Sequence, residues 1–157
     1  MKPGPLRAYA LPALFALAVS MTAIPASAAA PAKAALQIEH AWIRWLPADL
    51  PAAAYAVIVN HGDTNARLIG ANSSDYDMLM LHRSRLDKGS SLMQTVAGMD
   101  IPAHGEAALT PGGFHLMLTD PKRAIKPGDT VTIILRFADG TTLQADFPVR
   151  PANASGP

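Results

Sequence analysis

Short apolar runs separated by turn-forming residues fill the chain from about residue 36 onward. Leu36–Ile43 alternates apolar and polar residues, whereas Ala54–Val59 is continuously apolar and ends at the turn signal Asn60-His61-Gly62-Asp63. No segment keeps a 3.6-residue apolar period over the ten or more residues that a helix needs. The pattern therefore predicts an all-β fold, a sandwich or barrel of eight to nine short strands with little helix. The other expected strands are Arg67–Gly70, Tyr76–His82, Ser91–Val96, Glu106–Leu109, Phe114–Leu118, Thr130–Phe137 and Thr141–Val149.

The first 28 residues differ from the rest and are typical of a cleavable signal peptide. Lys2 and Arg7 form a positive start, an apolar stretch follows over residues 8–19, and Ala26-Ser27-Ala28 is a small-residue cleavage site. A membrane-spanning helix is the alternative, but Ser20, Thr22 and Pro25 interrupt the apolar run before about 20 residues. We therefore predict export to the periplasm, with no membrane anchor after cleavage. The expected domains are a signal peptide over 1–28, a flexible lead-in over 29–35, one globular domain over 36–150 and a disordered tail over 151–157.

Removing the signal peptide changes how the composition is interpreted. Without Lys2 and Arg7 the chain has eleven basic and twelve acidic residues, a net charge of −1, which argues against nucleic acid as a partner. The chain contains no cysteine, which excludes a disulfide framework, a lipid-anchored cysteine at the cleavage site and the thiolate ligand of an electron-transfer cupredoxin. The five remaining methionines all lie within residues 78–117, although methionine usually spreads through a core.

Two histidines and two methionines in this window form the candidate metal site. They are His82, Met93, His115 and Met117. Thioether sulfur is a poor ligand for hard cations and a good one for Cu(I), so a mixed His/Met set without thiols indicates monovalent copper. A strand has a period of two, which places His115 and Met117 on one face with Leu116 and Leu118 opposite, and Met78, Met80 and His82 opposite Leu79 and Leu81. We expect the leucines to fill the core and the candidate ligands to gather at one end of the sandwich.

The spacing His82-x10-Met93-x21-His115-x-Met117 resembles the signature of the periplasmic copper chaperones of the PCu(A)C family. Ala41-Trp42-Ile43-Arg44 and Pro111-Gly112-Gly113-Phe114 are similar to further landmarks of that family, and the similarity covers about residues 36–150. The resemblance implies a cupredoxin-like Greek-key β-sandwich that holds one Cu(I) per chain. The chain departs from the family at Arg83, which follows His82 where a methionine often stands. It also lacks the His/Met-rich extension of some relatives.

The resemblance also implies a function. A monomeric metallochaperone would carry Cu(I) to the binuclear copper centre of cytochrome c oxidase subunit II, together with a thiol-bearing copper assembly factor. General periplasmic copper storage or scavenging would use the same ligands, and a metal-free exported binding module is a further alternative. We predict no enzymatic activity, because the chain has neither a Gly-x-Ser-x-Gly nor a His-Glu-x-x-His motif. Met80 and Met99 are reserve ligands, whereas His40, His61 and His104 are expected to be structural or exposed.

Overall fold

The computed structural model describes residue 4, residues 35–47, 50–87 and 89–157, and all secondary structure in these ranges is β. Apart from residue 4, the predicted signal peptide lies outside the described residues, as does the lead-in apart from residue 35. Within them no helix has the length and apolarity to cross a membrane. Ten strands follow one another: β1 (Leu36–Arg44), β2 (Ala52–Asn60), β3 (Ala66–Ser73), β4 (Tyr76–Asp87), β5 (Ser90–Thr95), β6 (Met99–Ile101), β7 (Gly105–Leu109), β8 (Phe114–Pro121), β9 (Thr130–Phe137) and β10 (Thr142–Arg150).

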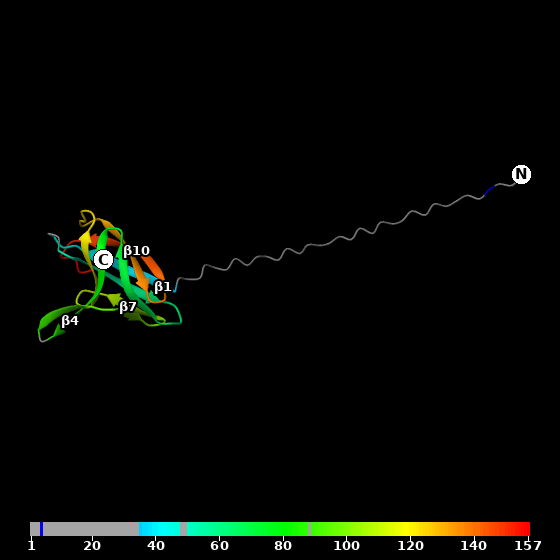
Figure 1. Cartoon of the computed structure of the whole chain (residues 1–157), viewed down its shortest axis with the longest axis horizontal. Coiled ribbons are helices and arrows are strands. Elements are labelled where there is room, and N and C mark those ends of the chain that lie inside the picture. Colours follow the sequence, from blue (N-terminus) through cyan, green and yellow to red (C-terminus); the bar gives the residue numbers. More distant parts are fainter. Residues whose placement is uncertain (1–3, 5–34, 48–49, 88) are drawn as a thin grey trace. The chain divides into compact units, whose positions relative to one another are not determined.

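The hydrogen-bonded order of the strands is β5-β4-β8-β7-β2-β1-β10-β9-β3-β6. Strand β10 pairs parallel to β1 on one side and antiparallel to β9 on the other, so it links the layer built on β2 to the layer built on β9 (Figure 1). Because both layers bury one face, the result is the cupredoxin-like β-sandwich expected from the sequence. The prediction of an all-β fold is confirmed, with ten strands in place of eight or nine.

The core lies between the layers and is built mainly from one residue in two along each strand. Leu81 and Leu116 are cross-strand neighbours on β4 and β8, and both are buried, as is the adjacent Leu118. Phe137 and Phe147 are the largest fully buried side chains and come from β9 and β10. The predicted leucine face is therefore the core face, and it leaves the opposite face of β4 and β8 available for the candidate ligands.

Strand β1 departs from simple alternation at a β-bulge. Its pairing with β2 shifts register between Glu39 and Trp42, and His40 within the bulge has a φ of 51°. A bulge inserts one extra residue and exchanges the faces of all that follow. Ile43 consequently enters the core, while Trp42 and Arg44 lie on the face that β4 and β8 use for the candidate ligands.

The distal part of the β4–β5 hairpin extends away from the rest of the domain (Figure 1). All residues of β5 are exposed, and β5 pairs only with β4 at the edge of the sheet. Leu86 at the far end of β4 is 78% exposed, so this hairpin contributes little to the core. It carries one candidate ligand, Met93.

Candidate metal centre

His82 and His115 are direct cross-strand neighbours on β4 and β8. Residues opposite each other in an antiparallel pair share a face, so the two imidazoles meet although 32 residues separate them in the chain. Their ring centroids are 5.8 Å apart and the rings are nearly perpendicular. Both side chains are buried, and they are two of the three buried polar side chains among the described residues. The pairing of β4 with β8 thus brings two of the four predicted ligands, His82 and His115, together.

Hydrogen bonds determine which ring nitrogens are available. His115 Nδ1 lies 3.2 Å from the carbonyl oxygen of Gly113, and since a carbonyl only accepts, Nδ1 must carry the proton. The lone pair of His115 is therefore on Nε2. His82 Nε2 lies 3.0 Å from the hydroxyl oxygen of Thr95 on β5. When Nε2 donates to this hydroxyl, the lone pair of His82 is on Nδ1.

His82 Nδ1 is the one buried side-chain nitrogen or oxygen in the described part of the chain that has no hydrogen-bond partner. A buried polar atom left without a partner costs free energy, and such atoms are rare in native structures unless an ion or water completes them. Burial, assisted by the neighbouring His115, lowers the pKa of His82 below its ordinary value. A neutral imidazole with an unused lone pair is the form that binds a transition metal.

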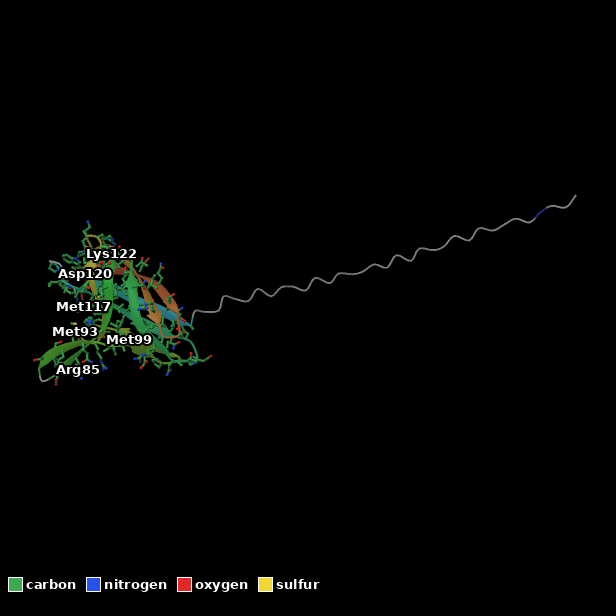
Figure 2. All side chains as sticks on the ribbon, in the orientation of Figure 1. Arg85, Met93, Met99, Met117, Asp120 and Lys122 are labelled. Atoms are coloured by element: carbon green, nitrogen blue, oxygen red, sulfur yellow. The ribbon has the colours of Figure 1, made fainter. Side chains whose placement is uncertain are left out.

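Met117 and Met93 come to the same face from two neighbouring strands. Met117 lies two residues after His115 on β8 and is partly buried. Met93 pairs with Ser84, two residues beyond His82 on β4, and is 53% exposed. Both are labelled in Figure 2, and both line a cavity of about 190 Å³ together with His115. The structure therefore places all four predicted ligands on adjacent strands β5, β4 and β8.

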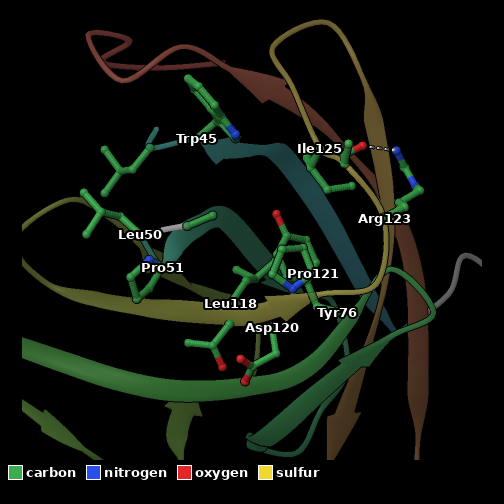
Figure 3. Close-up of a pocket in the computed structure, with 13 residues that line it drawn as sticks. Trp45, Leu50, Pro51, Tyr76, Leu118, Asp120, Pro121, Arg123 and Ile125 are labelled. Carbon is green, nitrogen blue, oxygen red and sulfur yellow. Dashed lines mark hydrogen bonds between the residues drawn. The ribbon is translucent and has the colours of Figure 1, made fainter. Parts of the chain in front are cut away.

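A larger cavity of about 580 Å³ lies beyond the β1–β2 connection and shares Leu46, Pro51 and Ala52 with the smaller one. Figure 3 shows its lining, which includes Tyr76, Asp120 and Arg123 but no histidine or methionine. Arg123 is already paired with Asp75 and Asp129. The larger cavity therefore offers no soft ligand, whereas the smaller one adjoins the candidate metal centre and is lined by three of its four ligands.

Three further residues border the centre that the predicted ligand set did not include. The ring centroid of Tyr55 on β2 is 6.4 Å from that of His115, and 4.7 Å from that of Trp42 on β1. The guanidinium carbon of Arg44 lies 5.4 Å from both aromatic centroids, within the range of cation–π attraction. Trp42 and Arg44 belong to the segment Ala41-Trp42-Ile43-Arg44 that resembles the family, but the sequence does not clearly indicate the bulge that brings them to this face.

The reserve ligands separate in the structure. Met80 lies opposite Met117 in the β4–β8 register, hence on the ligand face. Met99 is 3% exposed in β6 and belongs to the core, away from β4 and β8. His61 bonds the side chain of Gln37 and His104 pairs with Asp63, while His40 is exposed in the bulge. These three histidines have the structural or exposed positions that we predicted.

The donor set fits copper better than harder metals. Within the described ranges no three residues among His, Asp, Glu and Cys converge as a metal site, so zinc or calcium coordination of the common kind has no basis there. Two imidazole nitrogens and two thioether sulfurs are soft, neutral donors that suit Cu(I). Because all four are uncharged, a bound Cu(I) would keep its positive charge.

Comparisons with known proteins agree with the fold and with copper as the metal. The model of the family described as "Putative lipoprotein LpqE-like" matches residues 36–149. The putative lipoprotein Lxx21020 of Leifsonia xyli subsp. xyli (strain CTCB07) is 35% identical over 130 residues, which cover 81% of this chain and 78% of the relative.

Two solved structures are similar along most of their length. The copper-bound PCuAC domain from PmoF2 is 25% identical with a TM-score of 0.62, over 74% of this chain and 93% of that one. The solution structure of CuI-DR1885 from Deinococcus radiodurans is 32% identical with a TM-score of 0.61, over 78% of this chain and 83% of that one.

Proposed function

We propose, from the premise that this chain belongs to the LpqE-like family of PCu(A)C domains, that it binds one Cu(I) and passes it to another protein. His82, Met93, His115 and Met117 would be the ligands. The site would act outside the cytoplasm, in the periplasm, after export by the signal peptide over residues 1–28. The acceptor that we propose is the binuclear copper centre of cytochrome c oxidase subunit II, reached with a thiol-bearing assembly factor.

One observation supports this proposal most strongly: the unpartnered, buried Nδ1 of His82 lies on the ring that faces His115, on the strand face that Met93 and Met117 share. The other nitrogen of each ring is held by a hydrogen bond to Thr95 or to the carbonyl oxygen of Gly113, and metal-binding histidines are usually oriented by such a bond. A core histidine pair without a ligand would be expected to satisfy all its nitrogens.

The donors also suit release. Neutral thioethers are weaker donors to Cu(I) than thiolates, so a thiolate of an acceptor can replace them without a change in the oxidation state of copper. Met93 is half exposed on the edge hairpin, where an incoming ligand meets no packed layer. We therefore expect exchange to begin at Met93 and to end at the buried histidines.

The experiment that tests the proposal is a transfer assay with the chain from residue 29 onward, loaded with Cu(I) under reducing conditions. Native mass spectrometry should first show one copper per chain. The loaded protein is then mixed with the apo soluble domain of cytochrome c oxidase subunit II, the two are separated, and the copper in each is measured. Copper should move to the acceptor in wild type, whereas His115→Ala should bind too little copper to transfer any.

Two results would contradict parts of the proposal. Absence of bound copper in wild type would favour a metal-free binding module. Tight binding of one copper that stays on this protein, in the presence of excess acceptor, would favour storage or scavenging, which requires the same ligands but no acceptor.

A further inference from the structure

The smaller cavity is lined by three of the four candidate ligands, Met93, His115 and Met117, and these do not explain the positive charge of Arg44 in the same lining. Of the residues that line this cavity, Arg44 is the one with a charged side chain, and no aspartate or glutamate lines it. Among the described residues no carboxylate lies within salt-bridge distance of Arg44. A bound Cu(I) and the guanidinium would therefore repel each other, which lowers affinity for the metal.

The position of Arg44 is determined by the surrounding structure. Its Nε donates a hydrogen bond to the carbonyl oxygen of Ala154 at 3.2 Å, in a turn where Ala154 also bonds Pro151. The guanidinium stacks over both Trp42 and Tyr55. Only the bulge in β1 puts Arg44 on this face, since strict alternation from the buried Leu36 would turn Arg44 to the core face, where Ile43 now lies. The guanidinium of Arg44 repels a bound Cu(I), but both would attract an anion placed between them.

Tyr55 adds a neutral donor to the same wall. It is 6% exposed and lines the cavity between Arg44 and His115. Burial raises the pKa of its phenol above the ordinary value, although the nearby Arg44 opposes this shift. The phenol therefore remains protonated at neutral pH and cannot itself be the anion that balances Arg44.

We propose that the cavity beside the metal centre is a receiving site for a soft anion, the thiolate of the copper acceptor, and that Arg44 binds and orients that thiolate. A volume of about 190 Å³ is large enough for one cysteine-sized side chain. This inference rests on the proposed function, because it describes how the same copper leaves. Arg44 is a positioning residue for exchange and donates nothing to the metal.

The exchange step keeps charge and electrons balanced. The incoming thiol loses its proton to solvent, because a nearby guanidinium lowers the pKa of a thiol. A sulfur lone pair of the thiolate then forms a bond to Cu(I) while the bond from a methionine sulfur breaks. Copper remains monovalent, and the thiolate neutralises one of the two positive charges at the site. A neutral incoming donor, such as an imidazole, would not be attracted by the charge of Arg44 in this way.

The test compares three forms of the Cu(I)-loaded protein: wild type, Arg44→Gln and Arg44→Lys. Release of copper is followed with 2-mercaptoethanol, which reacts as a thiolate, and with N-methylimidazole, which is neutral. Arg44→Gln should slow release by the thiol about tenfold, the equivalent of about 1.4 kcal/mol, and leave release by N-methylimidazole unchanged. Arg44→Lys keeps the charge and should retain most of the thiol rate.

A second readout separates this role from a structural one. Without the thiol, Arg44→Gln should bind Cu(I) at least as tightly as wild type, because a repulsive charge has been removed, whereas a collapsed site would bind it more weakly. The matched control is Arg85→Gln, which removes the same charge from an exposed position on the β4–β5 hairpin (Figure 2) and should change neither rate. High salt should reduce the difference between Arg44→Gln and wild type.

A peptide with two cysteines, used in place of 2-mercaptoethanol, identifies the source of the thiolate. Dependence on Arg44 with both thiols indicates a protein acceptor, and dependence with the small thiol alone indicates a low-molecular-mass thiol. Equal slowing of thiol and N-methylimidazole in Arg44→Gln, or no slowing of either, overturns the proposal. Failure of wild type to bind Cu(I) at all would instead refute the proposed function, so the two failures are distinct.

Discussion

Replacing Met93 by leucine separates ligation from packing, because the side chain is 53% exposed on a strand that contributes little to the core. Full burial of a methionine is worth about 1.5–3 kcal/mol, and leucine retains most of the apolar surface of the buried half. Leucine also has nearly the same volume, a swap that usually costs less than about 1.5 kcal/mol even in a core. At this half-exposed position we expect the free energy of unfolding of the metal-free protein to change by less than about 0.5 kcal/mol.

Copper affinity should respond quite differently to the same change. If Met93 supplies one of four donors, Met93→Leu should weaken Cu(I) binding at least about tenfold, or about 1.4 kcal/mol. Affinity is measured by competition with a coloured Cu(I) chelator, and stability by urea denaturation of the apo protein. A large change in affinity beside a small change in stability identifies a ligand.

Met78→Leu is the matched control for this experiment. Met78 is 47% exposed, which is close to the value for Met93. It lies on the same face of β4 as His82 but does not line the cavity. It should change neither affinity nor stability appreciably. Unchanged copper binding in Met93→Leu would refute the ligand assignment and direct attention to Met80, which lies opposite Met117.

Three other predictions concern the supports of the site. Leu116→Ala removes a fully buried side chain from the core face of β8, so it should lower the free energy of unfolding by about 2–5 kcal/mol in urea denaturation. Thr95→Val removes the hydroxyl that holds His82 Nε2, and chelator competition should show a loss of copper affinity of about 10–100-fold with the fold retained. The lowered pKa of His82 means that the unfolded chain binds a proton in a range where the folded chain does not. Stability of the apo protein should therefore fall as pH falls below the unfolded value of about 6.5, until the lowered folded pKa is reached. His82→Gln should flatten this dependence in urea denaturation at several pH values, and an unchanged slope would contradict the assignment.

The ligand face could be predicted from the sequence because it depends on a period of two within single strands. Leu79, Leu81, Leu116 and Leu118 mark the core face of β4 and β8, which leaves His82 on the other face together with its cross-strand neighbour. The pattern required no knowledge of the tertiary fold, only that both segments are strands. For the same reason the strand class of nearly every segment could be assigned.

The remainder of the site depends on features without a local signature. The bulge in β1 occurs at His40, a non-glycine residue at positive φ, and strict alternation counted from Leu36 would place Arg44 on the core face. The end of β4 was also missed, because its polar continuation to Asp87 pairs with β5 outside the core and has no apolar pattern. The hydrogen bond between His82 and Thr95 follows from this unpredicted pairing.

The distribution of the four donors between buried and exposed strands bears on how a carrier can hold its cargo firmly and still release it. His82 and His115 lie on paired strands and each ring is held by one hydrogen bond, so moving either would break contacts in the sheet. Met93 lies on the exposed edge strand, where replacing it disturbs no packed neighbour. Removing Met93 from the metal therefore costs less free energy than removing either histidine. Exchange can begin with the loss of Met93, which is the least costly step, and end with the loss of the histidines.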